Sequence, residues 1–306
     1  MSKAYAFTAF GGPEGQAFLD RPVPVPGPGE LLVEVRAAGV NPVDWKVRRG
    51  LLGRELPLPH VFGSEVAGVV RGLGPGVAGF EAGAAVFGPT LTGGYARHTL
   101  LPAAQSARLP PNVSHVQAAV LPVAAGAAYD ALGQLALGEG GTLLILGVGG
   151  GVGTVAAQLA RRAGLVVLGT VSEAGRAYVE GLGVTPVRHG EGVAGRIRAA
   201  APQGVDGVLD LVGGEDARAA AETLRRPGRL VSTVDPVTAV ELDGTFVRRT
   251  HTADTLDALA ALVAAGELDP RITATYPLEQ AGQALAAVET GHVRGKVVLE
   301  IGAEDR

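Results

Sequence analysis

The sequence contains no cysteine, has few aromatic residues and carries little net charge. Of its 306 residues none is Cys, 4% are aromatic, and the formal net charge is −4. Without cysteine the chain can form no disulfide, no catalytic thiolate and no zinc site with sulfur ligands, and it suits a reducing, cytoplasmic location. It also lacks a basic tail and a basic patch interleaved with aromatic residues, so nucleic acid is not expected as a partner.

Charge is absent altogether from residues 140–160, a run of 21 residues that is long enough to cross a bilayer. Seven of these residues are glycine and most of them cluster in the middle of the run, as in a loop between two elements. No other segment resembles a membrane span or a signal peptide. We therefore expect a soluble, cytoplasmic protein with no membrane partner.

The segment Thr142–Val171 follows the order strand, glycine loop, helix, strand. Leu143–Leu146 is a short apolar run bounded by glycine, which favours a parallel strand covered on both faces. After the loop, apolar residues recur every three or four positions, which predicts a helix with one face packed on the sheet. This βαβ order is typical of a dinucleotide-binding unit.

The glycine loop has the composition of a phosphate-binding turn. Between Gly147 and Gly153 only Val148 and Val152 carry side chains, so the backbone can turn tightly and approach a ligand, and the start of the next helix favours an anion. No lysine follows the glycines, which disfavours a nucleotide triphosphatase, and the strict G-x-G-x-x-G spacing is missing, so a purely structural turn is the alternative. The predicted cofactor contacts are Gly147, Gly149, Gly150, Gly151, Val152 and Gly153.

The end of the second strand indicates which dinucleotide is bound. NAD binders place an acidic residue there, whereas this chain has Thr170, Val171 and Ser172. Ser172 offers a hydroxyl, and Arg176, one turn further on, offers a guanidinium for a 2′-phosphate. We therefore expect NADPH, with Arg188 as a second candidate for the phosphate and solvent exposure of Arg176 as the alternative.

The remaining pattern predicts two domains. Residues 1–122 contain short β-rich segments separated by proline and glycine, typical of an antiparallel, partly barrel-like domain. Residues 123–265 alternate helix and strand, which predicts a doubly wound α/β domain with a parallel sheet. Residues 266–306 are expected to complete the first domain through a strand at 295–301. In the second domain we also predict a helix at 216–226 and strands at 205–214, 229–234 and 241–249.

Six segments carry a family resemblance, in matching order and spacing: AAGVNPVDWKVRRG (37–50), PHVFGSEVAGVV (59–70), GGYARHTLLPA (93–103), LPVAAGAAYDAL (121–132), LGVGGGVG (146–153) and RGKVVLEI (294–301). With them the chain resembles, over nearly its whole length, the zinc-free medium-chain dehydrogenases/reductases of the quinone oxidoreductase group, which includes zeta-crystallin. The resemblance implies a GroES-like catalytic domain, a Rossmann cofactor domain, NADPH, and a homodimer joined through the edge strands of the cofactor domain.

The chain departs from zinc-dependent relatives of this family. They carry a cysteine about where Asn41 stands and a histidine where Ser64 stands, so both catalytic metal ligands are missing here. Six histidines remain without a close ligand spacing, and we expect no metal site.

Without a metal, the expected reaction is hydride transfer from NADPH to a quinone or an α,β-unsaturated carbonyl. Negative charge then develops on the carbonyl oxygen, so hydrogen-bond donors near it dominate the protein's contribution. The candidates are Asn41 through its amide, Lys46 through its charge, and Tyr95 through its hydroxyl or as a proton source. Asp44 is expected to hold the loop. The competing structural interpretations are a turn or cap for Asn41, solvation for Lys46 and a core position for Tyr95.

The resemblance adds contacts to the nicotinamide half of the cofactor. It implies Val212 and Gly213, after the strand that ends at Leu211, and the backbone of Phe246 and Val247 on the last strand. The alternative is that all four belong to ordinary strands of the core.

Two other functions stay open. Reduction of enoyl thioesters on a related scaffold would need basic surface for a bulky acyl carrier, for which Arg48, Arg49 and Arg54 are candidates. A non-catalytic NADPH-binding protein, with a structural or redox-sensing role, is favoured by the absence of the hydroxyls that relatives carry near Lys46 and Ala127.

Overall fold

The computed structural model describes residues 1–302 and divides them into two compact units. Unit 1 contains Met1–Val123 and the part of the chain from His251 onward, and unit 2 contains Ala124–Thr250. The chain thus leaves unit 1 once and returns to it once, as the β-rich ends and the α/β middle of the sequence predicted.

Unit 2 is built on one parallel sheet of six strands in the order β11-β10-β9-β12-β13-β14. This is the doubly wound order in which the strand order reverses beside the first strand, β9. The strands are β9 (Thr142–Leu146), β10 (Val166–Val171), β11 (Thr185–Arg188), β12 (Val205–Asp210), β13 (Leu224–Ser232) and β14 (Thr245–Phe246).

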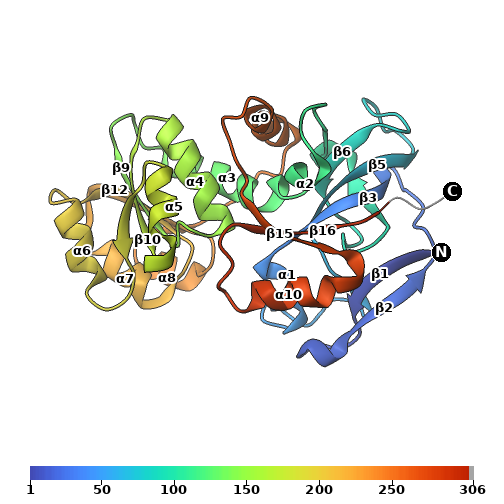
Figure 1. Cartoon of the computed structure of the whole chain (residues 1–306), viewed down its shortest axis with the longest axis horizontal. Helices are drawn as coiled ribbons and strands as arrows, with labels where there is room; N and C mark the ends of the chain where they lie inside the picture. The colour runs from blue at the N-terminus through green and yellow to red at the C-terminus, as the bar shows by residue number, and fades with distance from the viewer. Residues whose placement is uncertain (303–306) are drawn as a thin grey trace. The chain divides into compact units, whose positions relative to one another are not determined.

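Helices cover both faces of this sheet (Figure 1). They are α3 (Gly126–Leu135), α4 (Gly151–Arg162), α5 (Arg176–Gly181), α6 (Val193–Ala200), α7 (Gly214–Ala221) and α8 (Pro236–Glu241). Leu144 and Leu146 of β9 pack in one hydrophobic cluster with residues of α6, α7 and α8. Leu143 and Ile145 alternate with them and point to the opposite face, where α4 contacts β9 and α3. All four are fully buried, which confirms the central strand predicted from the apolar run.

Four predicted elements of unit 2 are wrong at their ends. The strand predicted at 205–214 ends at Asp210, and the strand predicted at 229–234 runs from Leu224 to Ser232. The helix predicted at 216–226 ends at Ala221, and Leu224 already pairs with Val205 in the parallel sheet. The strand predicted at 241–249 is reduced to Thr245–Phe246, because Pro236–Glu241 is helical. Asp235 caps that helix by accepting a hydrogen bond from the Thr238 N–H, and a proline at the first helical position favours the same start.

Unit 1 consists of two sheets. A three-stranded sheet has the order β2-β1-β4, and a seven-stranded sheet has the order β15-β16-β3-β5-β6-β8 with β7 also paired to β3. All pairs are antiparallel except β15 with β16. The strands are β1 (Ser2–Phe7), β2 (Gln16–Arg21), β3 (Glu30–Val40), β4 (His60–Val61), β5 (Glu65–Leu73), β6 (Ala85–Pro89), β7 (His98–Pro102), β8 (Ala107–Arg108), β15 (Ile272–Pro277) and β16 (Lys296–Glu300). The α-helices are α1 (Pro42–Arg48), α2 (His115–Ala118), α9 (Ala253–Ala264) and α10 (Ala281–Glu289).

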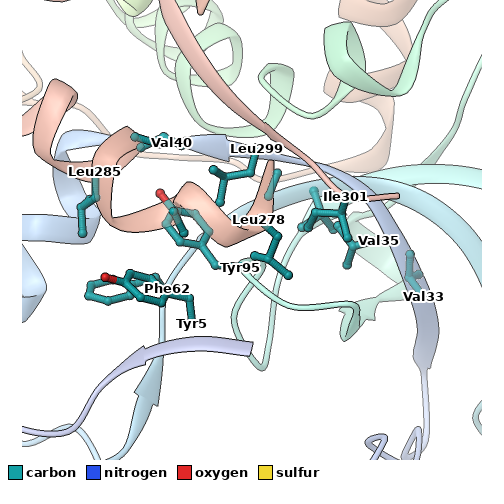
Figure 2. Packing of buried hydrophobic residues seen from close by; sticks show 14 of the residues in the cluster. Tyr5, Val33, Val35, Val40, Phe62, Tyr95, Leu278, Leu285, Leu299 and Ile301 are labelled. Atoms are coloured by element: carbon teal, nitrogen blue, oxygen red, sulfur yellow. The ribbon is translucent and has the colours of Figure 1, made fainter. Parts of the chain in front are cut away.

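The core of unit 1 joins the two ends of the chain. Val297 of β16 pairs with Val40 of β3, so the predicted return of the C-terminal strand to the first domain is confirmed. Figure 2 shows Ile301 packed beside Val35, and Leu299 and Tyr95 close to Leu278. Closing the larger sheet therefore requires residues about 255 positions apart in the sequence, such as Asn41 and Lys296, to be brought together.

The second boundary between the units differs from the predicted one. The sequence placed 251–265 in the α/β domain, whereas α9 belongs to unit 1. The reason is packing, because α9 contacts β8 and the Asn112 side chain donates a 2.7 Å hydrogen bond to the carbonyl of Ala264. An amphipathic pattern predicts a helix but does not say which sheet covers its apolar face.

One helical run, His115–Leu135, is long and apolar enough to qualify as a membrane span by length and composition, and 67% of its apolar window is buried inside the protein. The uncharged run 140–160 is not such a helix, because it is divided into β9, the glycine turn and the first part of α4.

Candidate functional site

The glycine loop of unit 2 is a tight turn between β9 and α4. Gly147 has a positive φ of 77°, and its N–H donates a 2.9 Å hydrogen bond to the hydroxyl of Thr170. The helix α4 begins after Gly150 without a side-chain cap. A Cβ added to Gly153 would lie 2.5 Å from the carbonyl oxygen of Gly147, so this close approach of helix and turn requires glycine.

A second loop lies beside this turn. The carboxylate of Asp210, at the end of β12, accepts hydrogen bonds from the N–H groups of Val212 (3.0 Å) and Gly213 (2.8 Å), and Ser232 donates to its other oxygen at 2.7 Å. A Cβ on Gly147 would meet the side chain of Val212 at 3.0 Å. The structure thus brings the two predicted cofactor loops together at the carboxyl ends of the strands, and Asp210 and Ser232 brace one of them.

The bracing residues Thr170, Asp210 and Ser232 were missed by the sequence reasoning. Each is buried, with at most 2% of its surface exposed. The available signal was the polar residue that closes each apolar strand, because such residues of parallel strands meet at one edge of the sheet.

The predicted backbone contacts of Phe246 and Val247 lie at the same edge. Phe246 pairs with Ser232 in the sheet, and its side chain is 41% exposed. The N–H of Val247 donates to the carbonyl of Ser232 at 2.9 Å and is therefore engaged within the sheet. A cofactor contact from the Val247 N–H is not supported by this arrangement.

The residues expected to select NADPH lie near the end of β10. Ser172 and Arg176 are exposed, and the Arg176 guanidinium forms an ion pair with Glu180 one turn along α5, at 2.9 Å. Arg188 ends β11 directly beside Val171, the last residue of β10. The structure therefore places Arg188, the second candidate, next to the strand end at which the ribose is expected.

These features fit a dinucleotide. The turn leaves no side chain between the backbone and a ligand, and α4 begins at it with N–H groups that have no partner in the first helical turn. Gly147, Gly149, Gly150, Gly151, Val152 and Gly153 would hold the pyrophosphate, and the loop at Val212 and Gly213 lies beside them.

In unit 1 the predicted donor Asn41 belongs to a buried polar cluster. Its side-chain amide donates a 2.8 Å hydrogen bond to Glu65, and the Lys296 ammonium donates to its carbonyl oxygen. Lys296 also forms a 3.0 Å ion pair with Glu65, and the exposed fractions of the two side chains are 5% and 0%. The Asn41 side chain is thus held by two partners within the protein, and its donation to the substrate stays a prediction.

Tyr95 and Asp44 form the next part of this cluster. The Tyr95 hydroxyl donates a 2.8 Å hydrogen bond to Oδ2 of Asp44, and the Asn41 N–H donates to the same oxygen at 2.9 Å. Burial, followed by the charge of Asp44, raises the pKa of Tyr95 well above its ordinary value. Tyr95 is therefore a core residue as well as a partner of Asp44, and its direct contact with the substrate stays a prediction. The prediction that Asp44 holds the loop is confirmed by the Asn41 bond at the start of α1.

Lys46 and Trp45 lie on α1 and are both partly exposed. The Lys46 ammonium lies 5.8 Å from the centroid of the Trp45 ring, and the Arg49 guanidinium lies 5.7 Å from it. Lys46 remains a candidate for a charge near the substrate, and among residues 1–302 no hydrogen bond or ion pair joins it to the buried cluster.

A cavity of about 150 Å³ opens in unit 1 beside Asp44. Phe7, Val47, Val61, Phe62 and Leu91 supply its apolar walls, and Asp44, His60, Ser64 and Thr90 supply its polar groups. Burial lowers the pKa of His60, which favours a neutral imidazole. Apolar walls with a few convergent polar groups are typical of a small-molecule site. Only Asp44 among the predicted catalytic residues lines it.

Comparisons with known proteins agree with this geometry. Residues 27–111 match the alcohol dehydrogenase GroES-like domain, and residues 182–299 match the zinc-binding dehydrogenase domain. Human quinone oxidoreductase is 30% identical over 98% of both chains, and the mouse synaptic vesicle membrane protein VAT-1 homolog is 31% identical over 99% of this chain and 84% of that protein. The structure of the quinone oxidoreductase from Coxiella burnetii is 30% identical and covers 98% of this chain and 99% of that chain, with a TM-score of 0.91.

The chain belongs to the medium-chain dehydrogenase/reductase family and is similar to zeta-crystallin within it. It is an oxidoreductase that uses a nicotinamide cofactor and acts on a small molecule.

The zinc in the name of the matched domain does not fit the residues of this chain. By the resemblance, Asn41 and Ser64 stand where zinc-dependent relatives carry their two catalytic ligands, and the Asn41 side chain is hydrogen-bonded to Lys296 and Glu65. An ammonium group against Asn41 opposes a cation there. Among residues 1–302 no group of three or more His, Cys, Asp or Glu side chains is placed to hold a metal.

Proposed function

We propose that this enzyme is an NADPH-dependent, metal-independent reductase of quinones or α,β-unsaturated carbonyls. The observation that carries the proposal is the Lys296–Asn41–Glu65 cluster, a buried ion pair bonded to Asn41, the residue that by resemblance stands where zinc-dependent relatives carry a cysteine ligand. Quinones and enones accept hydride without a Lewis acid, whereas an alcohol or a simple ketone needs its oxygen polarised. The quinone oxidoreductases among the relatives support the same substrate class.

The cavity in unit 1 supports a small, flat head group. Its volume of about 150 Å³ is below the roughly 300–1,000 Å³ of sites for drug-sized ligands, so it suits a single ring or a short enone. The cofactor supplies the hydride when bound. The protein holds the electrophile against apolar walls that exclude water, and the Ser64 hydroxyl is the donor placed to meet the oxygen on which charge develops.

The preference for NADPH is supported by the charge at the end of β10. No carboxylate occupies that strand end, and Arg188 and Arg176 lie at or near it. Because Arg176 is already paired with Glu180, Arg188 is the stronger candidate for the 2′-phosphate.

Enoyl thioesters are less well supported as substrates. Arg48 is 1% exposed and pairs with Glu289 at 2.9 Å, and Arg49 pairs with the same carboxylate. Only Arg54 of the three expected cations is left without such a partner among residues 1–302, so little basic surface remains for an acyl carrier.

A homodimer through the cofactor unit is part of the proposal. β14 is the last strand of its sheet, so one side of this strand is an open edge. Phe246 (41%), Val237 (66%) and Val240 (70%) are exposed on β14 and the adjoining α8. Pairing of two such edges would cover these side chains and complete the ladder.

The proposal is tested by NADPH oxidation with 1,4-benzoquinone, an alkenal and crotonyl-CoA side by side, with NADH in parallel. We expect turnover with one or both of the first two acceptors, faster with NADPH, and unchanged after dialysis against EDTA. Turnover with crotonyl-CoA alone would show that enoyl thioesters, and not quinones or enones, are the substrates. Loss of activity with EDTA, restored by zinc, would overturn the metal-free assignment.

A further inference from the structure

The reaction proposed above needs a proton as well as a hydride. A quinone or an enone that has accepted a hydride is an oxyanion, and it becomes the neutral product only when it takes up a proton. A side chain that delivers this proton must line the substrate site and carry an exchangeable hydrogen directed into it.

Four polar residues line the cavity of unit 1, and they differ in whether they can give a proton to a substrate there. The Thr90 hydroxyl donates at 2.7 Å to the carbonyl of Gly63. His60 is held towards its neutral form, because burial lowers its pKa, and its ring lies 5.3 Å from that of Phe7. A serine hydroxyl such as that of Ser64 is too weak an acid to give up its proton unaided. Asp44 is the only carboxyl group in the wall.

The hydrogen bonds of Asp44 fix which of its oxygens carries the acidic proton. Oδ2 accepts two hydrogen bonds, from the Asn41 N–H at 2.9 Å and from the Tyr95 hydroxyl at 2.8 Å. Among residues 1–302 no hydrogen bond goes to Oδ1. An oxygen that already accepts two donors cannot also bear the proton, so the proton of the neutral acid lies on Oδ1, and Asp44 meets the cavity.

We propose that Asp44 is the general acid that protonates the substrate in this cavity, and this inference rests on the proposed reductase function. The reduced nicotinamide would supply the hydride from a C–H bond that breaks as the cofactor is oxidised, and the electron pair forms the new bond to hydrogen on the substrate, which leaves a negative charge on the substrate oxygen. The Oδ1–H bond of Asp44 then breaks, its electron pair stays on the carboxylate, and the proton forms an O–H bond on the substrate. Water entering the emptied cavity restores the proton to Asp44.

The surroundings of Asp44 suit this role. Burial raises the pKa of the carboxyl group to about 6, against the hydrogen bonds from Asn41 and Tyr95 and the charge of Lys296, which lower it, while the charge of Glu65 adds to the rise. His60 is the remaining titratable group that faces the same cavity. An acid must be protonated to donate, so turnover with a quinone is expected to fall as the pH rises through this pKa.

The test compares two acceptors in the full-length protein with bound NADPH. 1,4-Benzoquinone needs a hydride and a proton, whereas the N-methylphenazinium cation takes a hydride and needs no proton. For Asp44→Asn, whose amide oxygen can still accept from Asn41 and Tyr95, we expect kcat with benzoquinone to fall about 10²–10⁴-fold and to lose its pH dependence. With N-methylphenazinium we expect a change of less than about threefold. Asp20→Asn, an exposed aspartate of unit 1, is the matched control and is expected to leave both rates unchanged.

Tyr95→Phe provides a second readout in case Asp44→Asn does not fold. It removes a hydrogen bond that stabilises the carboxylate, so the midpoint of the pH profile with benzoquinone should move to higher pH. An equal loss with both acceptors in Asp44→Asn, or wild-type kcat with benzoquinone at every pH, would overturn the inference, as would an unmoved midpoint in Tyr95→Phe. If the wild-type protein oxidises NADPH with neither acceptor, the reductase function fails instead.

Discussion

The cofactor loops of unit 2 offer backbone groups, whereas the polar cluster of unit 1 is made of side chains. In the cofactor loops, Gly147 is needed for its positive φ, and Gly153 is needed because a Cβ there would collide with the turn. The cluster in unit 1 consists of side chains, with Asn41, Glu65 and Lys296 bonded to one another away from solvent. A site made of backbone tolerates many substitutions around it but no Cβ within the turn itself. A buried charge cluster, by contrast, is strongly destabilised when any one charged partner is removed.

The largest effect is expected from the cluster. Lys296→Met should lower the free energy of unfolding by about 3–5 kcal/mol, because Glu65 would be left buried without its cation. Denaturant unfolding at neutral pH measures this loss. Lys3→Met is the matched control, since its 3.9 Å ion pair with Glu279 is exposed and is expected to contribute less than about 1 kcal/mol.

The double variant Glu65→Gln with Lys296→Met should regain much of the lost stability, because the unpaired charge is gone. If Lys296→Met alone is as stable as the wild type, the cluster does not depend on its charged partners, and the proposed difference between the two sites is wrong.

Next in size is the glycine turn. Gly153→Val should weaken NADPH binding at least 100-fold, or about 2.7 kcal/mol, because its Cβ would lie 2.5 Å from the Gly147 carbonyl and open the turn. Fluorescence titration measures the binding, and circular dichroism reports whether the fold survives. Gly133→Ala, whose added Cβ meets nothing within 4 Å, is the control in the same unit. Unchanged affinity in a folded Gly153→Val protein would remove this turn from the cofactor site.

Another buried carboxylate of unit 1, Glu34, sharpens the comparison through the pH dependence of its contribution to stability. Glu34 is hydrogen-bonded to Arg36 and Arg71, and these bonds and charges outweigh burial, so that its pKa is lowered to about 2. Because this pKa lies below the ordinary 4.5, the stabilisation is present above about pH 4.5 and is lost as the pH falls towards 2. Glu34→Gln should therefore cost about 3 kcal/mol at pH 7 and little at pH 2. Denaturant unfolding of the wild type and the variant at the two pH values measures this loss of stability. If the loss is the same at pH 2 as at pH 7, it comes from packing and not from the charge of Glu34.

The smallest effect concerns the choice between the two cofactors. Arg188→Ala should weaken NADPH about tenfold, or about 1.4 kcal/mol, and leave NADH unchanged, because one exposed charge-assisted bond is lost. Arg176→Ala should have a weaker effect, since its guanidinium is shared with Glu180. Calorimetric titration with both cofactors distinguishes the two arginines. Equal losses for NADPH and NADH in Arg188→Ala would exclude it from phosphate recognition, and Arg198→Ala, paired with Glu222, serves as the control.

The sequence predicted unit 2 better than unit 1 for a physical reason. The strand, turn and helix at Thr142–Arg162 depend on local periodicity and on glycine, and both are visible in a short window. Asn41 and Tyr95 carry hydrogen-bonding groups whose partners lie far away in the sequence, at Lys296 and Asp44. A polar residue in a loop therefore suggested a catalytic donor, although distant residues had already satisfied it.

By itself the sequence determined the family, the order of the elements and the glycine turn, because these follow from spacing along the chain. Only the tertiary structure decided that α9 belongs to unit 1, that Asn41 is committed to Glu65 and Lys296, and that Asp44 lines a cavity. Those outcomes depend on which side chains meet across the closed sheets. Burial then decides whether a polar group is held within the protein or left to meet a substrate.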